Sequence, residues 1–201
     1  MSGVYALKEM YQIIKAMDFQ QVNLLKHVLH WKGHNTDGFD CSTTNLVIQN
    51  SLIHNQGSID SDVLVSGVVI SGNTIIENDQ AMRVKTINTS TNSTVTNITY
   101  SNNTATGLRQ FGILIDQSYP NTLKTPGNGV VISNITFGPP FSTLIMASGS
   151  GVDKVAVNCG VGSCIGPWDW SYLIVDGGGP GPINNFTGIV GFNQLPVHPG
   201  A

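Results

Sequence analysis

Short runs of β-branched and other apolar residues, separated by asparagine, glycine and serine, dominate the chain from residue 45 onward. β-Branched residues favour strands, whereas asparagine and glycine tolerate the positive φ of tight turns. Neighbouring units are offset by about 23 residues in one case and by more elsewhere, a period typical of a solenoid whose coils bury their apolar faces by stacking. The runs are Asn45–Ile53, Gly67–Ile76, Thr94–Tyr100 and Gly129–Phe137.

Each of the later runs is followed by a second apolar segment, and two all-β arrangements can account for such pairs. A sandwich needs antiparallel strands joined by two-residue turns such as Asn-Gly. The one such dipeptide, Asn128-Gly129, follows a long loop and does not join two strands. The pattern therefore favours a right-handed, single-stranded parallel β-helix of about five rungs. The second segments are Met82–Lys85, Phe111–Ile115 and Thr143–Met146.

The composition supports this fold class and excludes several functions. Charged residues make up 10% of the 201 residues and the formal net charge is −3. A helical bundle needs a surface of alanine, glutamate and lysine, which this chain lacks. Without a basic field, the chain is not expected to bind nucleic acid or an acidic membrane surface.

Three segments differ in character. Residues 1–32 scatter charges among apolar positions at helical spacing. This predicts an atypical segment with a helical pattern that is neither a signal peptide nor a transmembrane span. Residues 33–179 carry the strand pattern and form the predicted β-helix domain. Residues 180–201 lack periodicity and are expected to be an irregular C-terminal tail.

The cysteines, sequons and histidines carry weaker signals. Cys159 and Cys164 bracket a glycine-rich turn and either form a small disulfide loop or remain two thiols, whereas Cys41 has no evident partner. The histidines lack the three or four close ligands that zinc requires, so neither a metal nor a cofactor is expected. The excess of Asn-x-Ser/Thr sequons supports secretion. These sequons begin at Asn88, Asn92, Asn97, Asn102, Asn134 and Asn185.

Two polar motifs stand out from the strand pattern. Asn35-Thr36-Asp37 precedes the first clear strand and, taken alone, is an ordinary turn. Arg83 and Lys85 flank Val84 and therefore share one face of a strand. Two like charges side by side repel, so this pair indicates either a solvated edge or a site bridged by an anion.

Together these motifs resemble those of the polygalacturonases, in particular the fungal endopolygalacturonases, which cut α-1,4-linked galacturonic acid in pectin. Asn35-Thr36-Asp37 is similar to the family's Asn-Thr-Asp motif, and Arg83-Val84-Lys85 is similar to its Arg-Ile-Lys motif. The segment ending at Tyr119 is similar to the stretch that leads to the family's tyrosine. The resemblance covers about Gly33 to Gly179 in the family's order and implies a parallel β-helix.

The chain departs from the family where two motifs should lie. The family's Asp-Asp motif should follow Asn55-Gln56, yet Gly57-Ser58 comes next, as it does after the family's Gly-His-Gly motif. About one rung, with two aspartates and a histidine, is therefore absent. Asp60 and Asp62 follow this junction, but a surface turn explains them without any chemistry.

The resemblance implies an inverting hydrolase, in which a general acid and a water-activating base stand about 6.5–9.5 Å apart. Asp37 would be one of the water-activating carboxylates, whereas the general acid belongs to the missing pair. Arg83 and Lys85 would bind the galacturonate carboxylate, and Tyr119 would contact the neighbouring sugar. Asn35 is counted with the substrate-binding residues but would mainly orient its neighbours.

We therefore expect a polygalacturonase by descent with little or no hydrolase activity. The expected partner is pectin or polygalacturonate, the expected location is extracellular, and the expected state is a monomer. The alternatives are a galacturonate-binding β-helix without catalysis and an inactive fragment produced by a gene-model error.

Overall fold

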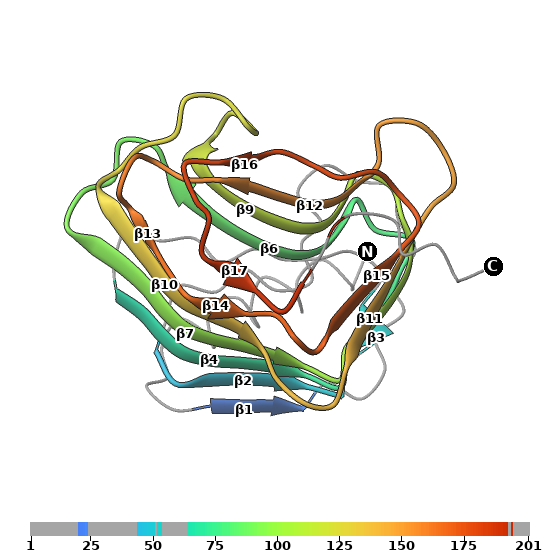
Figure 1. Ribbon diagram of the computed structural model, residues 1–201. Coiled ribbons are helices and arrows are strands. Elements are labelled where there is room, and N and C mark those ends of the chain that lie inside the picture. The colour runs from blue at the N-terminus through green and yellow to red at the C-terminus, as the bar shows by residue number, and fades with distance from the viewer. Residues whose placement is uncertain (1–19, 24–43, 51, 54–63, 193, 195–201) are drawn as a thin grey trace, which may run out of the picture.

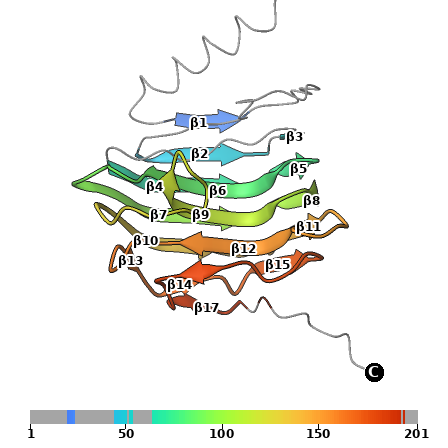
Figure 2. The same cartoon turned by 90° about the horizontal axis from the view of Figure 1, so that it is seen from above.

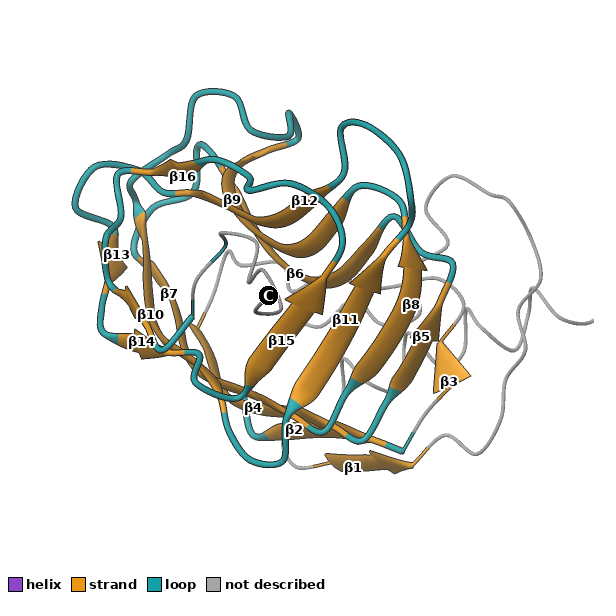
Figure 3. Ribbon diagram, turned by 45° about the vertical axis from the view of Figure 1, so that its right-hand side comes forward, coloured by secondary structure: helices purple, strands orange, loops and turns teal. Residues whose placement is uncertain are grey.

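The computed structural model describes residues 20–23, 44–50, 52–53, 64–192 and 194, and the regular structure in these segments is entirely strand. No described segment is a helix long and apolar enough to cross a lipid bilayer. Three parallel sheets enclose one core (Figures 1 and 3). Sheet A comprises β1 (Gln20–Asn23), β2 (Leu46–Gln49), β4 (Leu64–Ser71), β7 (Ser93–Ser101), β10 (Val130–Phe137) and β13 (Cys164–Ile165).

Sheets B and C complete each coil. Sheet B comprises β3 (Leu52–Ile53), β5 (Thr74–Ile76), β8 (Thr104–Leu108), β11 (Ser142–Met146) and β15 (Leu173–Asp176). Sheet C comprises β6 (Gln80–Ile87), β9 (Phe111–Tyr119), β12 (Asp153–Asn158) and β16 (Ile183–Asn184). A separate pair joins β14 (Trp168–Asp169) to β17 (Ile189–Val190).

The chain runs through sheets A, B and C in turn and then starts the next coil in sheet A, as the stacked layers in Figure 2 show. Four described coils have a strand in every sheet: β4–β5–β6, β7–β8–β9, β10–β11–β12 and β13–β15–β16. All sheet pairings are parallel, so Val68 lies beside Ile98 and Ile98 beside Ile135. The structure is the right-handed parallel β-helix that the sequence predicts.

The three second segments predicted from the sequence are all strands, but they do not lie in one sheet. Met82–Lys85 and Phe111–Ile115 lie in sheet C, whereas Thr143–Met146 lies in sheet B. The sequence does not distinguish strands of sheet B from strands of sheet C, because the corner between β4 and β5 consists of Gly72 and Asn73 alone. Such a short corner does not interrupt an apolar run.

Asparagine shapes the corners, as the composition predicted. Nine described non-glycine residues have positive φ, and seven of them are asparagines. Inside the corner between sheets A and B, Asn73 donates through Nδ2 to Asn103 Oδ1 at 2.9 Å, and Asn103 donates to the Ile70 carbonyl at 2.8 Å. These buried amides satisfy one another from coil to coil.

The stack extends beyond both predicted boundaries. At the N-terminal side, β1 lies within the segment predicted to be atypical and pairs with β2, whereas the helical pattern at residues 4–17 lies outside the described residues. At the C-terminal side, β16 pairs with β12 and β17 with β14, so residues 183–190 belong to the coils and not to an irregular tail. Two-residue strands are too short to show periodicity in a sequence.

Aromatic side chains close the core near the last coil. Trp168 and Trp170 are fully buried, and Trp168 packs on Phe186 with ring centroids 4.1 Å apart. Trp170 contacts Phe137 edge to face at 5.4 Å. The indole nitrogens donate to the carbonyls of Ile165 and Ile135, both at 2.9 Å. The tryptophans thus cap the core.

Candidate functional site

Sheet C carries the site, and β6 supplies its two cations. Val84 is buried in the core and is 1% exposed, so its neighbours Arg83 and Lys85 point to the outer face of the sheet. Arg83 is half-buried and Lys85 is 7% exposed. The alternation that the sequence predicted for these three residues is present.

Lys85 lies against the tyrosine at the end of the next strand. Its Nζ is 4.6 Å from the centroid of the Tyr119 ring, which is a cation–π contact. Tyr119 is placed by the pairing of β6 with β9, where a register shift follows Lys85 and brings Ile87 opposite Tyr119. Residues 34 positions apart in the chain therefore meet on one surface.

Several buried polar atoms on the same coil have no hydrogen-bond partner in the part of the chain that the structure describes. They are Arg83 Nε, Thr86 Oγ1 and both polar side-chain atoms of Asn78. Asn78 and Thr86 are each 1% exposed. Such atoms are rare in native structures and call for an explanation. They lie on or just before β6, the first described strand of sheet C.

Asp116 lies opposite Lys85 in the register of β6 and β9. It is fully buried, and its Oδ1 accepts from the Ser118 backbone NH at 3.0 Å and from Ser118 Oγ at 2.6 Å. Oδ1 also accepts from Asn158 Nδ2 at 2.9 Å, and Oδ2 accepts from the Leu123 NH at 3.0 Å. With these bonds Asp116 organises the loop that follows β9. Its oxygens are occupied, so it is not an acid or base for substrate.

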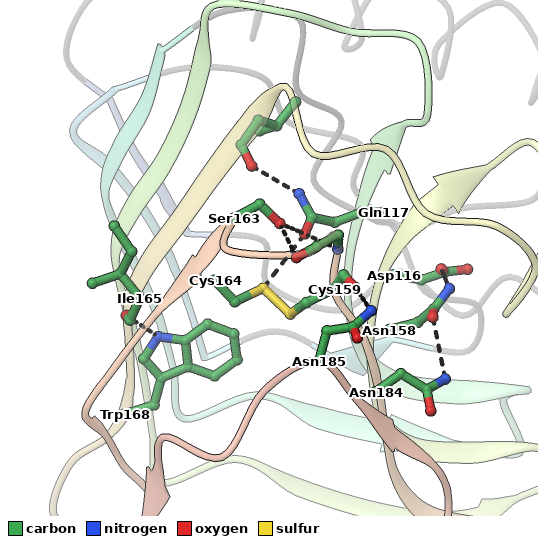
Figure 4. The surroundings of a disulfide bond; sticks show 12 residues. Asp116, Gln117, Asn158, Cys159, Ser163, Cys164, Ile165, Trp168, Asn184 and Asn185 are labelled. Atoms are coloured by element: carbon green, nitrogen blue, oxygen red, sulfur yellow. Dashed lines mark hydrogen bonds between the residues drawn. A yellow bond between two sulfur atoms is a disulfide. The ribbon is translucent and has the colours of Figure 1, made fainter.

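A line of amides continues from Asp116 across sheet C (Figure 4). Asn158 on β12 donates to Asp116 and to the Lys124 carbonyl at 2.9 Å, and its Oδ1 accepts from Asn184 Nδ2 at 3.2 Å. Lys124, Asn158 and Asn184 border a groove on this face. The sequence did not indicate these residues, since their partners come from different coils and no short motif joins them.

The Cys159–Cys164 disulfide is formed and lies beside this line of amides (Figure 4). Gln117, buried next to Asp116, accepts from the Gly160 NH at 3.0 Å and from Ser163 Oγ at 2.5 Å. These hydrogen bonds therefore attach the turn that the disulfide closes to β9.

The other residues singled out from the sequence lie outside the described residues. They are Asn35, Asp37, Cys41, Asp60, Asp62 and His27, His30, His34 and His54. Among the residues that are described, no cluster of three or more histidine, cysteine, aspartate or glutamate side chains is arranged to hold a metal. The structure thus brings together Arg83, Lys85 and Tyr119 and leaves the place of Asp37 untested.

Comparison with known proteins shows the family of the chain. The family model for Glycosyl hydrolases family 28 matches residues 56–190. "Endopolygalacturonase B" of Aspergillus oryzae is 34% identical over 77 residues, which are 37% of this chain and 20% of the relative. "Probable endopolygalacturonase B" of Aspergillus fumigatus is 38% identical over 74 residues, which are 36% of this chain and 19% of the relative.

A solved structure shares the fold. It is described as "Endopolygalacturonase I from Stereum purpureum complexed with two galacturonate", and it is 34% identical in sequence with a TM-score of 0.68. The match covers 81% of this chain and 56% of that protein. The chain thus matches about a fifth of the length of its curated relatives and little more than half of the solved structure. Because the family model covers more than half of its residues, this chain belongs to family 28 of the glycosyl hydrolases.

Proposed function

We propose that Arg83, Lys85 and Tyr119 form a galacturonate-binding site of the polygalacturonase type, in a chain that hydrolyses pectin weakly or not at all. The observation that carries this proposal is the position of Lys85 over the Tyr119 ring, two residues after Arg83 and on the same strand face. The site consists of two cations and an aromatic ring on the outer face of sheet C.

The chemistry of this arrangement suits a uronic acid. A carboxylate placed between the two cations relieves their repulsion, and a guanidinium can bind it through two parallel hydrogen bonds. Arg83 Nε is buried and has no hydrogen-bond partner among the described residues. The ring of Tyr119 offers a flat surface and a hydroxyl for the sugar. The solved relative described with two galacturonates supports the same ligand class.

Hydrolysis with inversion needs a general acid and a base on opposite sides of the scissile bond. Asp37 is the proposed base, and the Asp-Asp pair that would supply the acid is missing from the sequence. Asp116 cannot replace it, because it is fully buried and hydrogen-bonded through both oxygens. Loss of a general acid lowers the rate by about 10²–10⁴-fold.

The lengths of the coils support a missing segment. The connections from sheet B to the next strand of sheet A, which include the sheet C strand, have 16 (77–92), 21 (109–129) and 17 (147–163) residues in the coils that start at β4, β7 and β10. The connection from β3 to β4 has ten residues, 54–63. This difference falls at the junction where the two catalytic motifs are absent. The unpartnered Asn78, Arg83 and Thr86 atoms lie on the next coil.

A non-catalytic galacturonate-binding protein is the second candidate, and it is favoured by the same short connection. Both candidates place the protein outside the cell. The Cys159–Cys164 disulfide supports this location, because such bonds persist in oxidising compartments. The sequons add support for a glycosylated, secreted protein. The proposed partner is pectin, and the proposed state is a monomer.

Two assays on one preparation test the proposal. Calorimetric titration with digalacturonate is expected to show binding that Arg83→Gln weakens about tenfold or more, because charged hydrogen bonds contribute about 1.5–3 kcal/mol. Arg109→Gln is the matched control, since Arg109 is exposed and pairs with Asp79 at 2.9 Å away from the site. A reducing-sugar assay on polygalacturonate is expected to show little turnover.

The outcomes separate the possibilities. Equal affinity in the Arg83 and Arg109 variants contradicts the binding site. Ordinary turnover contradicts the loss of catalysis while leaving the binding site intact.

A further inference from the structure

Two of the sequons stand side by side on the outer face of sheet A. Asn97 lies on β7 and Asn134 on β10, and the residues on either side of them pair in the register of the two strands. Both asparagines are exposed and have positive φ, 55° for Asn97 and 52° for Asn134. The two acceptor side chains therefore leave the sheet from the same position on adjacent coils.

The amides of this pair are in direct contact. Asn134 Nδ2 donates to Asn97 Oδ1 at 2.7 Å, whereas Asn97 Nδ2 makes a longer hydrogen bond to Ser66 Oγ at 3.2 Å. A glycan attached to Asn97 leaves its Oδ1 free to accept, so the shorter bond persists. A glycan attached to Asn134 is carried by the nitrogen that donates the shorter bond. The hydrogen bonds therefore favour Asn97 as the modified residue.

The spacing of the coils leaves room for one glycan. Neighbouring strands lie about 4.8 Å apart, and a first sugar with its N-acetyl arm is broader than that distance. Two such sugars, on amides that are hydrogen-bonded to each other, would compete for the same volume above β7 and β10. A chain that received both sugars before folding would therefore oppose the pairing of these strands, which runs from Val130 to Phe137.

We infer that Asn97 carries an N-glycan and that Asn134, its neighbour in the stack, stays unmodified for that reason. The donor is a lipid-pyrophosphate-linked oligosaccharide. Asn97 Nδ2 forms a bond to the anomeric carbon of the first sugar, and the bond from that carbon to the phosphate oxygen breaks. The lipid pyrophosphate leaves with the electron pair, and the amide loses a proton. The inference rests on the extracellular location in the proposed function, because this donor belongs to the secretory pathway.

A glycan at this position leaves the galacturonate site accessible. Sheets A and C form different sides of the coil, and Asn97 lies on sheet A whereas Arg83 and Lys85 lie on sheet C (Figure 1). The glycan covers the middle of β7 and β10 instead. The affinity for digalacturonate is therefore expected to be the same before and after enzymatic removal of the glycan.

Secretion of the full chain through the pathway of a yeast tests the inference. Enzymatic deglycosylation in heavy-oxygen water converts each occupied asparagine into a labelled aspartate, which mass spectrometry assigns to its position. Thr99→Val removes the Asn97 sequon but keeps the asparagine, and valine has the shape of threonine and suits a strand. Thr99→Ser keeps the sequon and is the matched control.

In the secreted wild type and in Thr99→Ser we expect label at Asn97 and none at Asn134. In Thr99→Val the label is expected to be lost from Asn97 and to appear at Asn134, because the space is then free. Thr136→Val removes the Asn134 sequon and is expected to leave the label at Asn97 unchanged.

The other outcomes overturn the inference. Label at Asn134 in the wild type overturns the assignment to Asn97, and occupancies that sum to more than one glycan per molecule overturn the exclusion as well. A Thr99→Val protein without label at Asn134 shows that the glycan on Asn97 is not what keeps Asn134 bare. A secreted wild type without label at any sequon overturns the inference, and calorimetric titration of the same sample with digalacturonate decides the Arg83–Lys85 site separately.

Discussion

Replacement of Asp116 by alanine tests how the structure builds the outer face of sheet C. The carboxylate is fully buried and accepts four hydrogen bonds, from Ser118 NH, Ser118 Oγ, Asn158 Nδ2 and Leu123 NH. The Ser118 hydroxyl also donates to the Asn121 carbonyl, so it keeps a partner. The NH groups of Ser118 and Leu123 lose their acceptor. Asn158 loses its bond to Asp116 but still donates to the Lys124 carbonyl.

The magnitude follows from these contacts. A buried donor left without a partner costs about 1–3 kcal/mol. Two backbone NH groups are left in this state, and the Asn158 amide loses one of the two hydrogen bonds that it donates. Asp116→Ala is therefore expected to lower the free energy of unfolding by about 3–5 kcal/mol, near the upper end for single substitutions.

Urea denaturation measures the loss, and hydrogen exchange locates it. Exchange of the Leu123 and Lys124 amides is expected to accelerate, because Leu123 NH donates to Asp116 and Lys124 NH donates to Ser118 Oγ. Asp169→Ala is the matched control. Asp169 makes the same bonds to Ser171, at 2.9 Å from NH and 2.6 Å from Oγ, but it is exposed. A loss under about 1 kcal/mol for Asp116→Ala, or one no larger than that of Asp169→Ala, would refute the role of Asp116.

Two further predictions concern the core and the disulfide. Burial raises the pKa of Tyr100, so its neutral form is favoured in the folded state. The contribution of this group to the free energy of unfolding is therefore fully present below the ordinary tyrosine pKa of about 10. Above that pH the free energy of unfolding falls by up to about 1.4 kcal/mol per pH unit. Urea denaturation of Tyr100→Phe at rising pH is expected to lack this part of the decline, and equal slopes in both proteins would contradict it. Replacing Cys159 and Cys164 together by serine is expected to lower stability by about 2 kcal/mol, the value for so short a loop. No change in the denaturation midpoint of the wild type after reduction would contradict that value.

The sequence predicted the fold because its signal repeats in every coil. β-Branched runs with asparagine corners recur, and Val84 between Arg83 and Lys85 alternates as a strand with one buried face requires. The division into three sheets was not predictable, since Gly72 and Asn73 form a corner too short to mark a boundary. β16 and β17 were missed for a similar reason, because two residues carry no period.

The candidate site was predictable only where one motif contained it. Arg83 and Lys85 lie in a single strand, and the resemblance supplied Tyr119. The role of Asp116 could not be predicted, because Asp-Gln-Ser looks like an ordinary turn. Its partners Leu123 and Asn158 are 7 and 42 residues away in the sequence. The groove at Lys124 depends on the same long-range bonds. Only the stacking of coils brings these residues together.

A crystal structure of the protein with digalacturonate tests the central claim most directly. The account predicts a sugar carboxylate within about 3 Å of the Arg83 guanidinium, between it and Lys85, with the adjoining sugar against the Tyr119 ring. A digalacturonate bound on sheet A or sheet B, with the outer face of β6 empty, would contradict it.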